Sequence, residues 1–345
     1  MTNSSTRRYK QVSVQSFGGP ENLEILNTLP LEPSEHEVIV DLTSIGVNQA
    51  DLMARRGEYR LSSGEPPFTP GIEGGGVITA VGTHVTNRQI GQKVILTLDA
   101  PMGKGTYRSQ FAASAAETVP VPEGIANHLI GALWLPFVTA WGALVWRQNI
   151  QPGQVVLLPA ASSSVAIAAS QIVKHYGGIT IGTTTSPKKI DKLNDLQAAQ
   201  YDHLVVVAED AKEPWWRTVK KIAQREEGRR GVDVIFDPIA AGNFLHHEIR
   251  ILAPRGTLWI YGLLGAPDTV DVSPLIRKNA AIRGWLLNFI SSTVAEKQAY
   301  QHVLSNIVSG TYTLPVAQQF SLDNVREAHR TLEQGNHIGK FILVP

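Results

Sequence analysis

From about residue 155 onward, short apolar runs alternate with stretches of helical spacing, and this alternation constrains the fold more than any other feature. Residues 155–158 are a continuous apolar run, residues 165–176 have apolar residues at helical spacing, and residues 179–183 are a second apolar run. Continuous apolar runs of this length are typical of parallel strands covered on both faces. The sequence therefore predicts a doubly wound parallel sheet, with its ligand crevice outside the carboxyl ends of the strands.

The alternation continues to about residue 308. The later segments expected in this part of the chain are strands and helices in turn: strands at 204–207, 232–236, 257–261 and 281–286, and helices at 214–227, 244–252 and 294–308. Proline at the first position of the segment 214–227 favours a helix start there. These segments supply the five or six strands that a doubly wound sheet needs.

The first third of the chain has a different pattern, in which apolar and polar residues alternate in short runs separated by glycine and proline. Strands are expected at 11–16, 38–45, 76–81 and 93–98, in an irregular antiparallel domain. After Gly310 the chain returns to a β-type pattern, and its run at residues 340–344 is expected to rejoin the first sheet. The predicted organisation is 1–127 for the first part of a β-rich domain, 128–290 for the parallel sheet, and 291–345 for the return.

Charge and cysteine content exclude several function classes. Lysine plus arginine number 31 and aspartate plus glutamate 30, a net charge of +1, which argues against nucleic-acid or anionic-membrane partners. The chain has no cysteine, which removes disulfides, thiolate zinc sites, iron–sulfur clusters and a cysteine nucleophile. With 345 residues, two domains are expected.

One stretch, residues 129–146, carries no formal charge and could imitate a membrane span. Gly131, Pro136 and Gly142 interrupt it, and a two-domain chain needs buried helices of this kind, so a buried helix pair is predicted instead. Residues 1–8 are polar and lack the apolar core of a secretory signal. A cytoplasmic protein is therefore expected.

The turn after the run 155–158 contains Ser162, Ser163 and Ser164 and has no glycine. In a dinucleotide fold this turn brings backbone N–H groups to a pyrophosphate, and small residues are needed because a large side chain obstructs the approach. Three hydroxyls at a helix N-terminus can cap the helix and also donate to a phosphate. A structural cap without a ligand is the alternative reading of the turn.

The second strand is followed by Thr184, Thr185, Ser186, Lys188 and Lys189. A carboxylate at this point would bind the ribose hydroxyl of NAD and repel a 2′-phosphate, and none is present. Hydroxyls with two lysines predict a preference for NADPH. The alternative is that the lysines are only the solvated start of a helix.

Several segments resemble the medium-chain dehydrogenase/reductase superfamily in order and spacing over residues 10–344. The matching segments are 46–51, 56–59, 70–82, 139–144, 236–238, 256–262 and 339–340. The branch that the chain resembles most is the zinc-independent quinone oxidoreductase and enoyl reductase group. This resemblance implies a Rossmann sheet with a GroES-like catalytic domain.

Relatives that use catalytic zinc hold it with cysteine and with the histidine of a Gly-His-Glu run, which reads Gly71-Ile72-Glu73 here. His246 and His247 are adjacent, so they would point apart on a helix. No metal site is therefore expected.

The resemblance implies an NADPH-dependent reductase that transfers hydride to a quinone or to an α,β-unsaturated carbonyl, both small-molecule substrates. Asn48 would lie beside the nicotinamide ribose and the substrate, and Thr139 near the carboxamide. Tyr59 matches a tyrosine of the substrate cleft and could donate a proton, or could only pack over the cleft. Asp51 is expected to orient or cap rather than to act as an acid.

The resemblance also distributes the remaining cofactor contacts along the chain. They are Ser162, Ser163, Ser164 and Val165 at the pyrophosphate, Thr184, Thr185, Ser186 and Lys189 at the adenosine end, Gly262, Leu263 and Phe289 near the nicotinamide, and Lys340 at the phosphates. A homodimer formed through the edge strand near 281–286 is implied as well.

Two departures from the family pattern qualify this expectation. Ser163-Ser164-Val165-Ala166 replaces a glycine-rich turn, and the methyl of Ala166 could shift the helix or weaken cofactor binding. Gln200-Tyr201 replaces a glycine-alanine pair. The alternatives are a non-catalytic NADPH-binding sensor or partner protein, and an enoyl reductase for carrier-bound acyl chains. The latter would need a basic docking patch, which Arg55, Arg56 and Arg60 could form.

Overall fold

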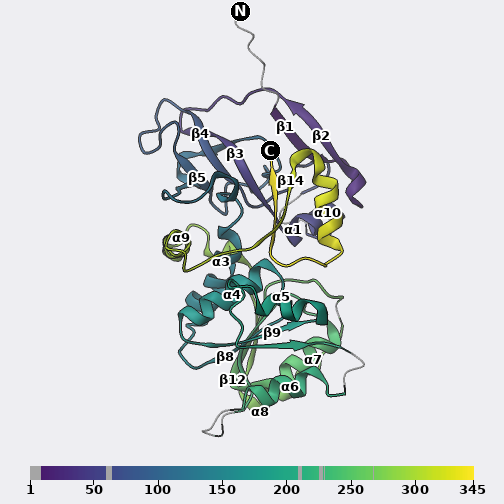
Figure 1. The fold of residues 1–345 in the computed structure, drawn as a ribbon. Coiled ribbons are helices and arrows are strands. Elements are labelled where there is room, and N and C mark those ends of the chain that lie inside the picture. The colour runs from purple at the N-terminus through teal and green to yellow at the C-terminus, as the bar shows by residue number, and fades with distance from the viewer. Residues whose placement is uncertain (1–8, 60–63, 209–211, 225–227, 229, 267) are drawn as a thin grey trace, which may run out of the picture. The chain divides into compact units, whose positions relative to one another are not determined.

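The structure is a computed structural model that describes residues 9–59, 64–208, 212–224, 228, 230–266 and 268–345 (Figure 1). The chain divides into two compact units. The first comprises Met1–Leu135, Tyr300–Thr311 and Val316–Pro345, and the second comprises Pro136–Ala299 and Tyr312–Pro315. The chain thus leaves the first unit, builds the second, and returns.

The second unit contains a six-stranded sheet in the order β10-β9-β8-β11-β12-β13, in which all neighbouring strands are parallel. The predicted doubly wound parallel sheet is confirmed. Its strands are β8 (Val155–Leu158), β9 (Ile179–Thr184), β10 (His203–Val206), β11 (Val232–Asp237), β12 (Leu252–Ile260) and β13 (Ala281–Gly284). The order reverses between β8 and β11, which is the position where such sheets bind their ligands.

Helices cover both faces of this sheet. In Figure 1, α4 and α5 lie on one side of the strands and α6, α7 and α8 on the other. The helices of this part of the chain are α4 (Ser164–His175), α5 (Ile190–Asn194), α6 (Trp215–Ile222), α7 (Gly242–Ile251), α8 (Ser273–Lys278) and α9 (Val294–Val308). The helix expected at 214–227 ends at Ile222, and residues 225–227 of that prediction lie outside the described residues.

The first unit contains a seven-stranded sheet in the order β14-β15-β3-β4-β5-β7, with β6 pairing to β3, and a separate β1-β2 pair. The strands are β1 (Tyr9–Val14), β2 (Leu23–Thr28), β3 (Glu37–Val47), β4 (Gly75–Val81), β5 (Lys93–Leu96), β6 (Gln110–Ser114), β7 (Thr118–Pro120), β14 (Val316–Ser321) and β15 (Lys340–Val344). β15 pairs antiparallel with β3, so the predicted return of the last strand to the first sheet is confirmed.

The alternating pattern predicted only β structure after Gly310, and this prediction was wrong in part. It contains α10 (Val325–Glu333), which buries Val325, Ala328, His329 and Leu332. These positions follow the spacing of one helical face, and that helical period decides the structure of the segment. A second helix, α1 (Gln49–Arg56), follows β3 directly.

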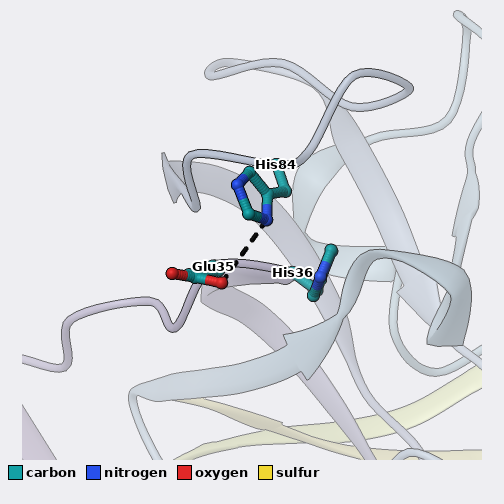
Figure 2. A group of neighbouring side chains, drawn as sticks. All are labelled: Glu35, His36 and His84. Atoms are coloured by element: carbon teal, nitrogen blue, oxygen red, sulfur yellow. Dashed lines mark ion pairs between the residues drawn. The ribbon is translucent and has the colours of Figure 1, made fainter.

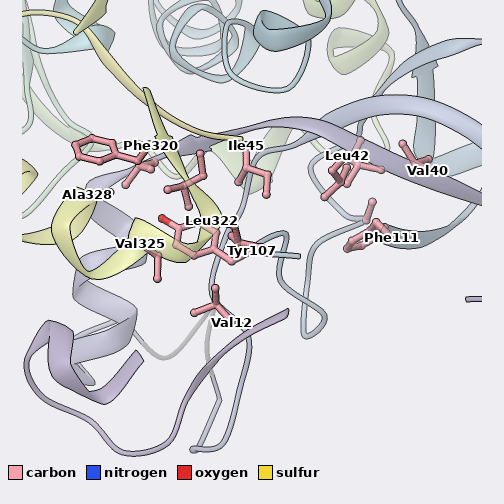
Figure 3. Packing of buried hydrophobic residues seen from close by; sticks show 14 of the residues in the cluster. Val12, Val40, Leu42, Ile45, Tyr107, Phe111, Phe320, Leu322, Val325 and Ala328 are labelled. Carbon is pink, nitrogen blue, oxygen red and sulfur yellow. The ribbon is translucent and has the colours of Figure 1, made fainter. Parts of the chain in front are cut away.

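The core of the first unit joins residues that are far apart in the sequence. Figure 3 shows Val12, Tyr107 and Phe111 from the first third packed with Phe320 and Val325 from the return segment. Burial of these side chains is the main force that holds the returning segment to the first sheet. The unit therefore needs both ends of the chain to complete its core.

The uncharged stretch 129–146 forms α3 (Trp134–Trp141) followed by a π-helical segment, η4 (Gly142–Arg147). No helix among the described residues is long and apolar enough to cross a membrane. The remaining short elements are 3-10 turns: η1 (Pro20–Asn22), η2 (Ala115–Glu117), η3 (Asn127–Leu129), η5 (Pro187–Lys189), η6 (Leu287–Ile290) and η7 (Leu322–Asn324).

Candidate functional site

The turn between β8 and α4 lies at the carboxyl end of the central strand. Ser163 is the N-cap of α4, and its Oγ accepts a hydrogen bond from the N–H of Ala166 at 3.2 Å. Ala166 is buried, and α4 begins regularly at Ser164, so the extra methyl does not prevent the helix from forming. Ser162, Ser163, Ser164 and Val165 are all partly exposed. The backbone N–H groups of this helix start are thus positioned to bind an anion.

The turn is anchored from two sides. The N–H of Ala161 donates to the carbonyl of Thr183 on β9 at 2.8 Å. The phenol of Tyr201 donates to the carbonyl of Ala161, also at 2.8 Å. The Tyr201 ring packs over Gly182, where a Cβ would come within 2.8 Å of the ring. Tyr201, which sequence reasoning noted only as a departure from the family, therefore supports the turn.

The segment after β9 places a cation next to the turn. Lys189 donates from Nζ to the Oγ of Ser162 at 2.9 Å, and partial burial lowers the pKa of Lys189. Thr184 is buried and its Oγ1 accepts from the N–H of Ser186 at 3.2 Å, whereas Thr185 is exposed. Lys189, predicted at the adenosine end of the cofactor, and Ser162, predicted at the pyrophosphate, are therefore in direct contact.

The loops after β11 and β12 are joined beyond the edge of the sheet. Leu264 and Gly265 donate backbone hydrogen bonds to the carbonyls of Pro238 and Ile239, at 3.0 and 2.8 Å. A Cβ at Gly262 would lie 2.7 Å from the carbonyl oxygen of Pro238, so the close approach of the two loops requires glycine there. These hydrogen bonds hold the two loops together next to the carboxyl ends of β11 and β12.

Two of the residues predicted near the nicotinamide have exposed apolar side chains. Leu263 is 63% exposed and Phe289, in η6, is 67% exposed. Thr139 in α3 is partly buried, and its carbonyl accepts from Trp285 Nε1 at 3.0 Å. All three belong to the second unit, so that unit carries most of the predicted cofactor contacts.

A pair of carboxyl groups lies beneath the loop after β11. Asp237 accepts hydrogen bonds from the N–H groups of Ile239 and Ala240, both at 2.7 Å. Glu248 of α7 is fully buried and faces Asp237. Burial, together with the neighbouring Asp237 carboxylate, raises the pKa of Glu248 well above its ordinary value. Burial and the neighbouring carboxylate thus favour the protonated form of the Glu248 carboxyl.

In the first unit, Asn48 belongs to a buried polar cluster. Lys340 donates from Nζ to Asn48 Oδ1 at 2.6 Å, and forms an ion pair with Glu73 Oε2 at 2.7 Å. Asn48 Nδ2 donates to the same Glu73 oxygen at 3.3 Å. The side chains of Lys340 and Glu73 are 1% and 0% exposed. The ammonium of Lys340, predicted at the cofactor phosphates, is thus held by Glu73 and Asn48.

Asp51 caps the start of α1 and extends this cluster. It accepts hydrogen bonds from the N–H of Asn48 at 2.8 Å and from the phenol of Tyr107 at 3.1 Å. His329 Nε2 lies 3.2 Å from the same phenol oxygen. Burial raises the pKa of Asp51 to about 7 and lowers that of His329 to about 3. Asp51 therefore has the capping role that the sequence favoured.

Tyr59 follows α1 and is the last described residue before position 64. Its side chain is half-buried, and burial raises the pKa of its phenol above the ordinary value. At neutral pH the group is therefore a protonated donor.

The carrier-bound alternative would need a basic docking patch, which Arg55, Arg56 and Arg60 could form, and the structure leaves Arg55 unavailable for it. Arg55 is 1% exposed and forms an ion pair with Glu333, and Arg56 pairs with Glu58 at 2.8 Å and with Glu333 at 3.3 Å. Arg60 lies outside the described residues. Arg55 is buried because helix α1 turns this side chain into the interior of the unit, toward α10.

The parallel sheet and the turn between β8 and α4 define a two-unit protein with a Rossmann-type sheet. Comparison with known proteins gives its family. The model of the alcohol dehydrogenase GroES-like domain matches residues 34–123, and the model of the zinc-binding dehydrogenase domain matches residues 202–343. The chain is 30% identical to human quinone oxidoreductase over 345 residues, which cover 97% of each protein. The chain belongs to the medium-chain dehydrogenase/reductase superfamily, in its quinone oxidoreductase branch.

Two further comparisons agree with this assignment. A synaptic vesicle membrane protein VAT-1 homolog from Danio rerio is 30% identical over 98% of this chain and 70% of its own length. The structure of Escherichia coli quinone oxidoreductase complexed with NADPH superimposes with a TM-score of 0.83 at 25% identity, over 97% of this chain and 100% of that one. The predicted pairing of a GroES-like domain with a Rossmann sheet is thereby confirmed.

Proposed function

We propose that the protein is an NADPH-dependent reductase that reduces a quinone or an α,β-unsaturated carbonyl. The observation that carries the proposal is the contact between Lys189 and Ser162, at the ends of two neighbouring parallel strands. It supplies a cation and hydroxyls, with no carboxylate in the segment 184–189, where a 2′-phosphate would bind. When bound, NADPH supplies the hydride.

The described residues fit such a cofactor. The start of α4, with Ser162, Ser163, Ser164 and Val165, offers backbone N–H groups and hydroxyls to a pyrophosphate. The adenosine end would be bound by residues that follow β9, namely Thr184, Thr185, Ser186 and Lys189. The nicotinamide end would lie near Thr139, Gly262, Leu263 and Phe289. Relatives with quinone oxidoreductase activity in their names support the same assignment.

In this proposal the reaction needs no metal ion in the cluster of the first unit. Glu73 already has the ammonium of Lys340 as its counter-ion, and Leu135 N–H donates to its second oxygen at 3.1 Å. Asn48, held by Lys340 and Glu73, would orient the substrate. The protonated phenol of Tyr59 would donate a hydrogen bond to the substrate carbonyl and so stabilise the negative charge that develops on it.

The test is steady-state oxidation of NADPH and of NADH with a simple quinone, a medium-chain enone and an α,β-unsaturated acyl thioester. We expect turnover of a quinone or the enone, with higher kcat/KM for NADPH. Lys189→Met should remove most of that preference, whereas the exposed control Lys188→Met should not. A preference for NADH in the unchanged protein would contradict the cofactor assignment.

Tyr59→Phe tests the proton donor. A loss of about 100-fold in kcat/KM is expected if the phenol stabilises the negative charge on the substrate carbonyl, since removal of one such donor costs at least about that much. Unchanged kcat/KM would show that Tyr59 only packs at the site. Tight NADPH binding without turnover of any substrate in the panel would favour the non-catalytic sensor. Turnover of the thioester alone would favour the carrier-bound substrate. The docking patch for the carrier would then have to form without Arg55, which is buried.

We also propose that the protein forms a homodimer through β13. This strand pairs with β12 on one side and is the edge of the six-stranded sheet. Its Arg283 and Gly284 are exposed, so its free edge is accessible to a second copy. Sedimentation of the unchanged protein and of an Ile282→Pro variant would test this. A monomeric unchanged protein would contradict it.

A further inference from the structure

Two histidines and a glutamate form a cluster in the first unit, among residues that the proposed reaction does not use. Figure 2 shows His84 turned toward the carboxylate of Glu35, with the His36 side chain next to them. One ligand atom of each lies within 4.8 Å of the corresponding atoms of the other two. Glu35 Oε2 is 3.4 Å from His84 Nδ1, and the two imidazole rings are 5.0 Å apart between centroids. All three residues are exposed.

The backbone fixes this juxtaposition. Glu35 and His36 precede β3, and His84 follows β4, which pairs with β3. The antiparallel hydrogen bonding continues past the strands, because Gly82 N–H donates to Glu37 O at 2.8 Å and His84 N–H to Glu35 O at 2.9 Å. The ends of the two strands thus hold the Cα atoms of the cluster in place, and only side-chain rotation is left to adjust.

Two contacts restrict the segments further. Ala115 N–H donates to the carbonyl of His36 at 3.0 Å, which ties the first segment to the turn after β6. A Cβ at Gly82 would lie 2.0 Å from the carbonyl oxygen of Ser34, so the absence of a side chain at position 82 allows the two segments to approach closely. The loop that carries His84 therefore packs closely against the segment that carries Glu35 and His36.

We propose that Glu35, His36 and His84 form a binding site for a divalent transition-metal ion of the Zn²⁺ class. Imidazole nitrogen and carboxylate oxygen are the ligands that Zn²⁺ takes in proteins without cysteine. Tetrahedral bonds of about 2.0–2.1 Å place neighbouring ligand atoms about 3.3 Å apart. The distance from Glu35 Oε2 to His84 Nδ1 already matches that spacing. Rotation of the exposed His36 side chain would bring the third ligand to it, and water would fill the fourth position.

An ion pair between Glu35 and His84 is the simpler explanation of their closeness, but it does not account for His36. An ion pair would involve only Glu35 and a protonated His84, and would make no use of the His36 imidazole, whose ring centroid is 5.0 Å from that of His84. A metal ion takes both imidazoles in their neutral form together with the carboxylate. A metal ion would therefore use all three side chains at once. Hard cations such as Mg²⁺ would bind the site poorly, because they prefer oxygen ligands.

The bound ion would link two loops of the first unit, so its expected effect is on stability and not on turnover. Zn²⁺ would stabilise the folded protein by mass action, and the stabilisation would grow with the free metal concentration. Affinity would fall on acidification, because protons compete for the imidazole nitrogens. Steady-state rates of the chelator-treated protein would stay unchanged, since none of the three residues belongs to the proposed reaction site.

The experiment is calorimetric titration of the chelator-treated full chain with ZnCl₂, followed by thermal unfolding with and without the ion. We expect a saturable site in the unchanged protein. His36→Gln, His84→Gln and Glu35→Gln should each weaken it at least about tenfold, as loss of a ligand costs at least as much as loss of its supporting group. All three side chains are exposed, so these variants should fold. His128→Gln, an exposed histidine of the same unit, is the matched control.

Three results would overturn the proposal. The first is the absence of saturable Zn²⁺ binding. The second is binding that the His36→Gln and His84→Gln variants retain at full strength, which would place the ion on other histidines. The third is equal weakening by His128→Gln, which would mean that histidines bind the ion nonspecifically. Mg²⁺ serves as the negative control ion, and binding of Mg²⁺ with equal affinity would contradict the assigned metal class.

Discussion

The phenol of Tyr201 donates a 2.8 Å hydrogen bond to the carbonyl of Ala161, and its ring occupies the space that Gly182 leaves open. This contact ties the loop before β10 to the turn at the start of α4. In a turn without glycine, conformation cannot depend on glycine's backbone freedom. The tyrosine supplies part of the restraint from outside the turn.

Replacement of Tyr201 by phenylalanine should therefore weaken NADPH binding without unfolding the protein. Loss of one hydrogen bond of about 1 kcal/mol corresponds to roughly fivefold weaker binding. Fluorescence titration with NADPH measures it. Tyr176→Phe, at the far end of α4, is the control and should leave the dissociation constant unchanged. Equal affinity of Tyr201→Phe and the unchanged protein would mean that the hydrogen bond does not shape the site.

Removal of the Lys340 charge should destabilise the first unit strongly. Lys340→Met leaves the Glu73 carboxylate buried without a counter-ion, which costs about 3–5 kcal/mol of unfolding free energy. The double variant Lys340→Met/Glu73→Gln should recover most of the loss, because neither charge remains. Urea unfolding measures both. Lys10→Met breaks the exposed pair with Asp323 and should cost less than about 1 kcal/mol. A similar cost for both lysines would contradict the role of burial.

Asp51 should make stability depend on pH. Burial raises the pKa of Asp51 from 3.8 to about 7, so the folded state keeps a proton that the unfolded state releases. Stability from this group is full below pH 3.8 and is lost as pH rises toward 7, at about 1.4 kcal/mol per pH unit. Asp51→Asn keeps the acceptor for Asn48 N–H and Tyr107 but should remove this slope.

Urea unfolding of both proteins between about pH 4 and 7 tests the prediction. The difference between the two is the relevant quantity, because His329 contributes with the opposite sign. Burial lowers the pKa of His329 to about 3, so its contribution to stability is lost as pH falls. Parallel stability curves for Asp51→Asn and the unchanged protein would show that Asp51 titrates normally.

Glu248 should make the stability of the second unit fall as pH rises, as Asp51 does in the first. Its raised pKa means that stability falls as pH rises above 4.5, the ordinary value for glutamate. Glu248→Gln keeps the shape and a donor toward Asp237, and should be more stable than the unchanged protein at pH 8. Thermal unfolding at pH 5 and pH 8 measures the difference, and the exposed Glu123→Gln is the control. A lower stability of Glu248→Gln at both pH values would contradict a neutral Glu248.

Much of the fold could be predicted from the sequence, because most parallel strands have clear apolar runs. The exception is β12, which begins at Leu252, five residues before the strand expected at 257–261. β8 begins and ends where the run 155–158 does, and α9 spans 294–308 as expected. The helix α10 was missed, because its apolar residues are few and its remaining positions are polar. Strands of the antiparallel sheet differ at their ends by one or two residues, where hydrogen bonding to neighbours and not local sequence sets the limits.

The candidate site was only partly predictable. The serines of the turn and Lys189 could be placed by the strand ends that precede them, since parallel strands end at the same edge of the sheet. The partner of Lys340 could not, because Glu73 lies 267 positions away and the contact depends on β15 pairing with β3. Burial of Arg55, which could have contributed to a basic docking patch, was not visible in the sequence either, because it depends on how α1 packs in the unit.

The return of the chain to the first unit has a consequence for protein synthesis. Glu73 is made early, but its counter-ion Lys340 and the strand β15 follow the whole of the second unit. A ribosome-bound chain can fold most of the second unit, from Pro136 to Ala299, while the part of β3 that pairs with β15 and the carboxylate of Glu73 still lack their partners. The first unit, although its synthesis starts first, is thus the last to be completed, and a stalled chain would expose that edge to neighbouring chains.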